Sequence, residues 1–182
     1  MATIADAQPT LTSARLTLRP LRRRDAAAIA RFAGDARVAR MTTSIPHPLP
    51  AGAAEAFVAG CLSSEAAEVV WAIEADRDDG PGLIGLISLE PRPGAEREIG
   101  YWIGPPFWGR GFASEAVATL IADVFRRGGV ARVIGTVFQD NPASARVLYK
   151  AGFLQIGEDR HACVARGEDV ARWVFARGGA GR

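Results

Sequence analysis

The stretch Gly104-Pro-Pro-Phe-Trp-Gly-Arg-Gly-Phe-Ala-Ser114 is the most informative segment of the chain, because it joins a strand-like run to an amphipathic helix. Gly109 and Gly111 allow backbone N–H groups to converge where the helix begins, and the positive helix end favours an anion such as a pyrophosphate. An ordinary tight turn would also use glycines here. A dinucleotide-binding turn, G-x-G-x-x-G, would need a third glycine at Ser114 and an acidic residue about 20 positions later, so the sequence disfavours it.

The segments on both sides of this stretch support a strand, a turn and a helix. Glu96 to Ile103 has the composition of a strand. After Phe107 the apolar period changes from two to 3.6, and one helical stripe is formed by Val117, Leu120, Ile121, Val124 and Phe125. Gly128 is expected to end this helix, after the basic pair Arg126 and Arg127 at its negative dipole end.

The rest of the chain alternates between the two kinds of element. Asp25 is expected to cap a helix over Ala26 to Ala33, and the prolines between Ile45 and Pro50 predict an ordered loop, called the lid loop below, before a helix over Gly52 to Leu62. Asn141 and Pro142 predict the start of a short helix that ends at Gly152. Further strands are expected at 16–20, 69–74, 83–89, 130–138, 153–157 and 170–175. The order βααβββαβαββ predicts an α+β fold, a mixed sheet with helices on both faces.

Length and composition indicate one globular domain. The 182 residues suit a single domain, 1–182, with a core over about 14–176 and poorly ordered termini, namely the first dozen residues and the tail from Arg177. Because 22 basic residues nearly balance 20 acidic ones, no direct nucleic-acid binding is expected. The longest apolar run is too short to span a membrane, and Cys61 and Cys163 suit buried thiols in a reducing cytosol, so a cytoplasmic protein without a metal site is expected.

Two blocks of sequence resemble a known family. The blocks are Glu98-Ile-Gly-Tyr-Trp-Ile-Gly-Pro-Pro-Phe-Trp-Gly-Arg-Gly-Phe-Ala-Ser-Glu-Ala116 and Asn141-Pro-Ala-Ser-Ala-Arg-Val-Leu-Tyr-Lys-Ala-Gly-Phe153. Together with Trp71-Ala-Ile-Glu74, they resemble the GNAT acetyltransferase superfamily and, more narrowly, its RimJ/RimL-like branch of ribosomal-protein N-terminal acetyltransferases. The resemblance covers about Leu16 to Phe175. It implies a strongly twisted sheet of about six to seven strands with splayed central strands, and acetyl-CoA as cosubstrate without a metal.

The resemblance also implies which residues hold the cofactor. Ile103 is expected to pair with the pantetheine through its main chain, as a ligand strand added to the sheet. The backbone N–H groups that would surround the pyrophosphate belong to Trp108, Gly109, Arg110, Gly111, Phe112, Ala113 and Ser114. Trp108 replaces the Arg or Gln that usually begins this turn in the family, which removes a side-chain donor and leaves the backbone. Asn141 is expected to contact the cofactor arm or to cap its helix, and Glu115 either meets substrate or complements the helix dipole.

The catalytic assignment has two parts. Ser144 is the expected proton donor to the departing sulfur, because Leu148 stands where many family members carry a tyrosine, and Tyr149, about 100° further round the helix, is expected to point elsewhere. Glu98 is the candidate base, acting through water. Glu96 lies on the same face of the strand, and a bulge near Gly100 would change which of the two acids reaches the site. The alternative is that both acids form a solvated acidic face of the strand.

The predicted function is transfer of an acetyl group from acetyl-CoA to a primary amine by direct attack in a ternary complex. A protein or peptide N-terminal α-amine is the favoured acceptor, because at pH 7 it needs less help to lose its proton than a lysine does. A small-molecule N-acetyltransferase, acting on an aminoglycoside, polyamine or amino acid, and a non-catalytic acyl-CoA-binding module are the alternatives. Monomer and homodimer both remain open. His47 and the basic cluster Arg22, Arg23, Arg24 and Arg31 are either surface features or substrate contacts.

Overall fold

The computed structural model describes residues 8–63, 65–76 and 82–179. Within these residues the chain forms five α-helices and one eight-stranded sheet. The helices are α1 (Ala26–Ala33), α2 (Ala36–Ala39), α3 (Ala53–Cys61), α4 (Phe112–Arg127) and α5 (Pro142–Lys150). The strands are β1 (Leu11–Thr12), β2 (Leu16–Pro20), β3 (Val69–Ala75), β4 (Gly82–Arg92), β5 (Glu96–Ile103), β6 (Arg132–Phe138), β7 (Leu154–Cys163) and β8 (Glu168–Gly178). The predicted α+β class is confirmed.

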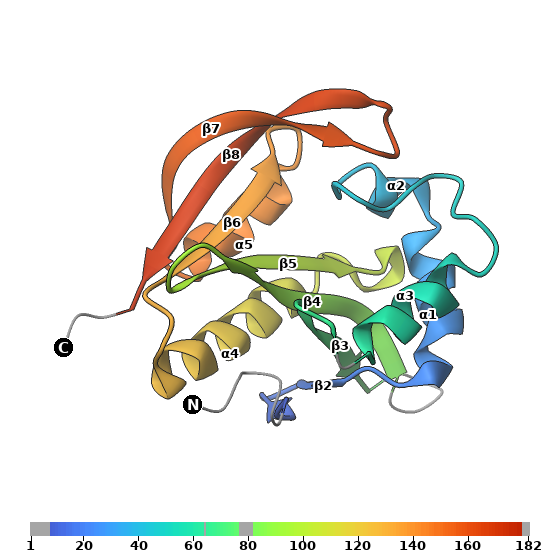
Figure 1. Ribbon diagram of the computed structural model, residues 1–182, viewed down its shortest axis with the longest axis horizontal. Coiled ribbons are helices and arrows are strands. Elements are labelled where there is room, and N and C mark those ends of the chain that lie inside the picture. The colour runs from blue at the N-terminus through green and yellow to red at the C-terminus, as the bar shows by residue number, and fades with distance from the viewer. Residues whose placement is uncertain (1–7, 64, 77–81, 180–182) are drawn as a thin grey trace.

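The strand order in the sheet is β1-β2-β3-β4-β5-β6-β8-β7. Neighbouring strands are antiparallel except β5 and β6, which are parallel. The β7–β8 hairpin rises above the rest of the sheet, and its tip lies beside the segment that carries α2 (Figure 1). The sheet therefore consists of a β1–β5 half and a β6–β8 half that meet at its one parallel pair among the described strands.

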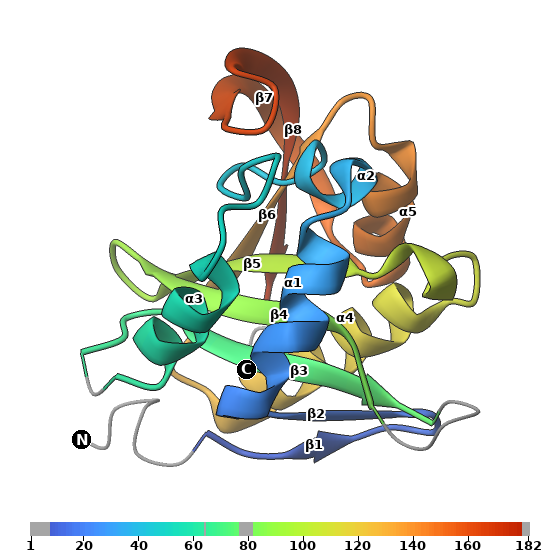
Figure 2. The ribbon, with the colours of Figure 1, turned by 90° about the vertical axis from the view of Figure 1, so that its right-hand side faces the viewer.

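Helices cover both faces of the sheet, as expected. α1 and α3 lie in front of β3 and β4 in Figure 2, while α4 lies behind them. One hydrophobic cluster packs α4 and α5 on the sheet and includes Ile73, Ile121, Leu148 and Phe175. A second cluster packs α1 and α3 on the other face and includes Ile29, Phe32 and Val58. β3 serves both clusters with alternate residues, since successive side chains of a strand point to opposite faces: Trp71 and Ile73 belong to the first cluster, and Val70 and Ala72 to the second.

The strand count is higher than the expected six to seven. Leu11 and Thr12 form β1 by pairing with Leu18 and Thr17, so the expectation that the first dozen residues are poorly ordered is wrong for this segment. Residues 1–7 lie outside the described part of the chain. At the other end β8 continues to Gly178, because Arg132 pairs with that residue, so the sheet extends into the segment expected to be a poorly ordered tail.

One local expectation is corrected, and one open alternative is excluded. Asp25 directly precedes α1, but its side chain makes no capping hydrogen bond there; it instead accepts from the Arg19 guanidinium, at 2.9 Å, and from the Arg22 N–H. β5 pairs with β4 in unbroken register through Gly100, so no bulge occurs there, and Glu96 and Glu98 stay on one face of the strand.

Candidate active site

The turn before α4 has the backbone that its glycines predict. Gly109 and Gly111 have φ of 74° and 80°, in the left-handed region, and Gly111 occupies the N-cap of α4. A Cβ at Gly109 would meet no atom within 4 Å, so the requirement there is conformational and not one of space. Within the described chain, no hydrogen-bond acceptor is found for the N–H groups of residues 109–114. These donors lie at a helix N-terminus on an exposed turn, which is an arrangement that binds anions.

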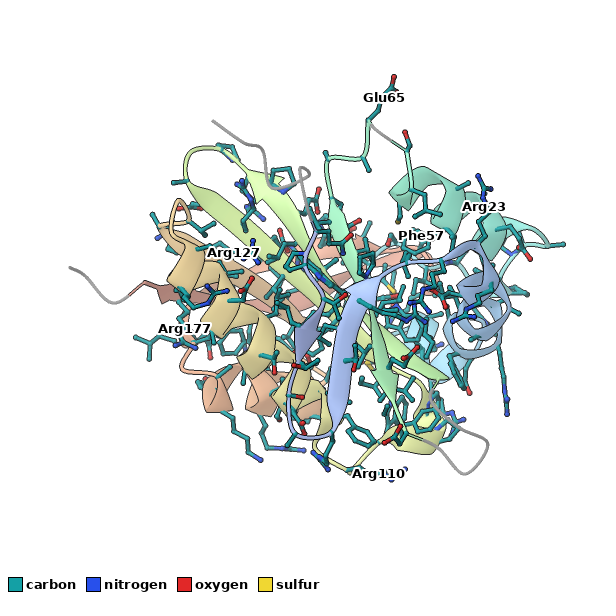
Figure 3. The ribbon with its side chains drawn as sticks, turned by 90° about the horizontal axis from the view of Figure 1, so that it is seen from below. Arg23, Phe57, Glu65, Arg110, Arg127 and Arg177 are labelled. Carbon is teal, nitrogen blue, oxygen red and sulfur yellow. The ribbon has the colours of Figure 1, made fainter. Side chains whose placement is uncertain are left out.

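Aromatic and ionic contacts hold this turn in place. The buried ring of Phe112 lies between the guanidinium groups of Arg15 and Arg110, whose Cζ atoms are 4.8 and 4.9 Å from its centroid. Glu115 accepts hydrogen bonds from Ser13 Oγ at 2.8 Å and from the Arg15 N–H at 2.9 Å. Glu115 thus ties the segment between β1 and β2 to α4, a contact that the sequence did not predict. Figure 3 shows Arg110 and Arg127 near opposite ends of α4, with Arg110 at an edge of the molecule.

Trp108 uses its side chain in a way that the sequence did not predict. Its indole Nε1 donates to the carbonyl oxygen of Ile103 at 2.6 Å, and the Arg37 guanidinium lies 5.7 Å from the ring centroid. Its own N–H donates to Pro105 at 3.2 Å, so Trp108 does not offer the backbone donor that was expected of it. The N–H cradle therefore begins at Gly109, and Trp108 covers the end of β5.

The two central strands separate, as expected of the fold. β5 and β6 are paired only from Glu96–Arg132 to Ile99–Gly135. Gly104 N–H donates to the carbonyl oxygen of Ile84 on β4. In an antiparallel pair, alternate residues bond to the partner strand, so the N–H and C=O groups of Tyr101 and Ile103 point away from β4, toward the β6 side. These groups face the gap between the strands. Ile103 therefore directs its N–H into the gap, while its carbonyl oxygen accepts from Trp108; its pairing with the pantetheine stays a prediction.

Ser144 is joined to a tyrosine on the face of the sheet that carries α4 and α5. The hydroxyl oxygens of Ser144 and Tyr101 lie 2.8 Å apart, and the Tyr101 hydroxyl also lies 3.1 Å from the Ser144 carbonyl oxygen. Burial raises the pKa of Tyr101, only partly offset by its bond to Ser144, so the phenol stays protonated at neutral pH. Asn141 caps α5 by accepting from the Ser144 N–H at 3.2 Å, as predicted, and its side-chain nitrogen remains a donor for another partner.

Neither Leu148 nor Tyr149 supplies a proton donor at this place. Leu148 is buried against Gly135, where an added Cβ would approach its Cδ1 to 2.8 Å. Tyr149 is half exposed; its hydroxyl donates to Gln155 at 3.1 Å and its ring packs edge-on against Phe175. Tyr149 therefore points away from the gap, as the helical spacing predicts, and Tyr101 is the tyrosine that lies beside Ser144.

A cavity of about 480 Å³ opens on the other face of the sheet, beneath α1, α3, the lid loop and the segment that precedes this loop. Its apolar walls include Ile29, Ile45 and Phe57, and its polar residues include Glu98 and Thr136. Ile99 and Tyr101, whose side chains pack on the opposite face, also line it. The cavity thus reaches, from the face that carries α1 and α3, the point where β5 and β6 diverge.

Glu98 lies in this cavity and is held by two partners. Its Oε2 pairs with Arg92, and its Oε1 accepts from Thr136 Oγ at 3.0 Å. Each carboxylate oxygen can accept two hydrogen bonds, so Glu98 keeps the capacity to accept from a substrate. Glu96 instead pairs with Arg132 at 2.5 Å and does not line the cavity. The two acids share one face of β5, as the sequence predicted, but only Glu98 lines the cavity.

The remaining candidates lie outside the cavity. His47 Nδ1 is 3.1 Å from the Gly34 carbonyl oxygen, and the residue lines a shallow depression on the far side of the lid loop. Arg22, Arg23 and Arg24 are exposed at the start of α1, where they make no ion pair with any described residue, and Figure 3 shows Arg23 at the edge of the molecule. Their roles stay predictions. The described residues include no group of three or more metal-ligating side chains and no helix long and apolar enough to cross a membrane.

Residues 15–154 match the family described as the acetyltransferase (GNAT) domain. The chain belongs to this family. YoaA of Bacillus subtilis (strain 168), called an uncharacterized N-acetyltransferase, is 34% identical over 152 residues, which cover 82% of this chain and 85% of YoaA. The expected membership of the GNAT superfamily is confirmed, and this protein is a GNAT acetyltransferase.

Two solved structures place this GNAT fold among proteins with different acceptors. RimL, a ribosomal L7/L12 alpha-N-protein acetyltransferase in complex with coenzyme A, superposes with a TM-score of 0.81 at 20% identity, covering 93% of this chain and 98% of that chain. Spermidine N-acetyltransferase from Vibrio cholerae, in complex with CoA and spermine, gives 0.76 at 19% identity, covering 92% and 97%. At such identities the likeness shows the fold alone, so the acceptor must be argued from this chain's residues.

Sequence reasoning missed three residues of the site: Tyr101, Thr136 and Arg172. Tyr101 stood inside the quoted motif, and strand alternation from Ile99 would have placed it on the Ser144 side of the sheet. Thr136 and Arg172 lie on β6 and β8, 36 positions apart, and meet through a hydrogen bond of 3.3 Å. Nothing in the local sequence indicates that contact, because it depends on the β6–β8 register.

Proposed function

We propose that this GNAT acetyltransferase transfers an acetyl group from acetyl-CoA to the N-terminal α-amine of a protein or peptide, as a RimJ/RimL-like enzyme of the cytoplasm. The carrying observation is the divergence of β5 and β6: N–H donors for a phosphate-bearing cofactor, unpaired within the described part of the chain, lie at the turn after β5, and the cavity that contains Glu98 reaches the point of divergence. We propose one acetyltransferase domain over residues 1–182, acting as a monomer or homodimer.

The chain's own groups fit acetyl-CoA. The N–H groups of residues 109–114, which lack acceptors among the described residues, would hold the pyrophosphate, and Asn141 would contact the cofactor arm through its free amide nitrogen. The N–H of Ile103 faces the gap, where it would pair with the pantetheine, and a backbone N–H at this end of β5 would polarise the acetyl carbonyl. Acetyl-CoA supplies a thioester that a neutral amine can attack directly.

The proposed proton transfers use opposite faces of the sheet. Glu98 accepts the proton of the incoming amine from the cavity side, directly or through water. Ser144 donates toward the departing sulfur from the α5 side, and Tyr101 orients the Ser144 hydroxyl. A thiol of pKa about 8.5 needs only modest assistance to leave. No covalent intermediate with the enzyme is required.

A small-molecule amine is the second candidate acceptor. Glu68 and Glu90 line the cavity besides Glu98, and these carboxylates suit a substrate with more than one positive charge. The solved spermidine N-acetyltransferase shares the fold. A protein N-terminus carries only one positive charge at the amine, so acceptor preference separates the two candidates.

The test is a thiol-release assay over peptide N-termini, lysine peptides, polyamines and aminoglycosides, with CoA binding measured separately by calorimetry. The proposal expects the highest kcat/KM with peptides that have a free α-amine. A higher kcat/KM with polyamines would show that the acceptor is a small-molecule amine and not a peptide N-terminus. Binding of acetyl-CoA without thiol release by any amine would instead indicate an acyl-CoA-binding module.

A further inference from the structure

Arg172 is a buried cation in the wall of the acceptor cavity, and the proposed chemistry gives it no role so far. It lies on β8 opposite Phe138 and is only 9% exposed. Burying a charge costs free energy unless the charge is paired. A buried arginine therefore either stabilises the fold through its ion pair or binds a ligand. The contacts of its guanidinium separate these two explanations.

The partners of Arg172 use part of its hydrogen-bonding capacity. Nε and Nη2 donate to the carboxylate of Asp159, at 2.8 and 2.7 Å, in a bidentate pair. Nη1 donates to Thr136 Oγ at 3.3 Å. A guanidinium has five N–H donors, so one hydrogen on each Nη remains without an acceptor among the described residues. The side chain is therefore fixed in orientation and still able to donate.

The same contacts place this arginine near the candidate base. Thr136 Oγ accepts from Arg172 Nη1 and donates to Glu98 Oε1 at 3.0 Å, so the Nη1 and Oε1 atoms lie no more than about 6.3 Å apart. In a peptide N-terminus the amine nitrogen and the first carbonyl oxygen are separated by two carbon atoms, about 3 Å apart in space. With a hydrogen bond of about 2.9 Å at each end, such a pair can bridge Glu98 and Arg172.

We propose that Arg172 is a specificity-determining residue that donates to the carbonyl oxygen adjacent to the acceptor amine. This inference rests on the proposed function and narrows its substrate class to α-amines that carry a neighbouring carbonyl or carboxylate, as peptide N-termini and amino acids do. A lysine side chain or a polyamine has no oxygen at that position. Such an acceptor leaves the two free donors of Arg172 unsatisfied and brings a cation close to them, both of which disfavour binding.

The experiment compares two acceptors of similar shape. Phenylalaninamide has the carbonyl beside its amine, and phenethylamine lacks it; both present an aromatic ring to the apolar walls. Arg172→Lys keeps the positive charge and loses the planar guanidinium with its fork of donors. In this variant we expect kcat/KM to fall about tenfold to a hundredfold with phenylalaninamide, and by less than about threefold with phenethylamine. The pKa of each amine is the same for both enzymes, so the change in the ratio reports Arg172 alone.

Two controls keep the result interpretable. Arg127→Lys, at the far end of α4, should leave both acceptors unchanged. Wild-type enzyme provides a check that does not depend on the folding of a variant: per unprotonated amine, phenylalaninamide must be acetylated faster than phenethylamine.

The outcomes separate the inference from the function on which it rests. Selective loss with phenylalaninamide supports the role of Arg172. An equal fall with both acceptors would show a merely structural residue, and a wild-type enzyme without preference would exclude carbonyl recognition; either overturns the inference and leaves the acetyltransferase intact. Binding of acetyl-CoA with no transfer to any primary amine would overturn the proposed function and this inference together.

Discussion

Ser144 and Tyr101 act as a pair, because neither hydroxyl has another side-chain partner among the described residues. Ser144→Ala should lower kcat about tenfold to a hundredfold at saturating acetyl-CoA. This loss lies at the lower end of the rate factors that general acid catalysis contributes, because a thiol leaves readily. Tyr101→Phe should give a smaller loss, because it frees the serine hydroxyl to rotate. Steady-state kinetics with a peptide acceptor checks both variants. Full kcat in Ser144→Ala would remove this residue from the mechanism.

Glu98 and Glu96 provide a matched pair for testing the base. At pH 7, neutralising an α-amine costs about 1 kcal/mol and a lysine about 4.6 kcal/mol. Glu98→Gln should therefore lower kcat/KM about tenfold to a hundredfold at pH 7 and recover most of it near pH 9, where the α-amine is already neutral. Glu96→Gln, which loses only the pair with Arg132, should retain activity. A pH–rate profile unchanged by Glu98→Gln would contradict the assignment.

The sequence predicted those residues of the site whose role follows from local structure. Gly109, Gly111 and Asn141 take the conformations or caps expected of them, because a turn or a helix start is determined by its own few residues. Trp108 was misjudged because its indole turns back to Ile103, a contact that the chain path alone does not indicate. The Arg172–Thr136–Glu98 chain could not be predicted, because it requires the registers of β5, β6 and β8 together.

At the scale of elements, the N-terminus of α4 binds its ligand only if the turn keeps its left-handed glycines. Gly111→Ala should strain φ at 80° by about 1 kcal/mol and, by shifting the N–H groups, weaken acetyl-CoA binding at least about fivefold in calorimetry. Gly129→Ala is the control, since Gly129 has φ of 81° and no atom within 4 Å of an added Cβ, but lies beyond the other end of α4. Equal affinity in both variants would contradict the anion-site assignment.

The elements that the sequence predicted well are those with one buried face. α1 and β5 match their expected bounds, and the apolar stripe of α4 is buried as its period requires. β7 was expected to be half as long, because it is an edge strand with nearly all its residues exposed and so shows no apolar alternation. β1 and α2 have two and four residues, too short for a periodicity to be detected.

At the scale of the whole molecule, the junction of the two sheet halves provides the proposed CoA-binding gap and is also held by few backbone hydrogen bonds. β5 and β6 share only a four-residue parallel ladder, so packing of α4 and α5 must hold the halves together where the backbone does not. The gap leaves the N–H and C=O of Tyr101 and the N–H of Ile103 without a partner on any described strand, since these groups face it. A ligand that pairs with these groups would replace the missing strand, so binding of CoA is expected to stabilise the fold as well as to deliver the acyl group.

The stability of the β1–β5 half rests on a buried ionic cluster at the start of α1. Arg19 donates to Asp25 at 2.9 Å and to Glu74 at 2.8 Å, and both Arg19 and Asp25 are buried. Burial acts to raise the pKa of Asp25, but the hydrogen bonds from Arg19 and from the Arg22 N–H outweigh it, and the net shift is downward. Asp25→Asn removes one charge and leaves Arg19 short of a partner, which should cost on the order of 3 kcal/mol in urea unfolding at pH 7.

The pH dependence of that cost follows from the sign of the shift. Because the folded pKa of Asp25 lies below its unfolded value of 3.8, its stabilisation is fully present above pH 3.8 and is lost as the pH falls through the folded value. The difference in unfolding free energy between wild type and Asp25→Asn should therefore be constant from pH 7 to about pH 5 and shrink below pH 3.8. Asp35→Asn is the surface comparison, since asparagine caps α2 equally well and the variant loses only an exposed ion pair with Arg37. A difference that stayed constant down to pH 2 would mean that the charge of Asp25 contributes nothing and only its shape matters.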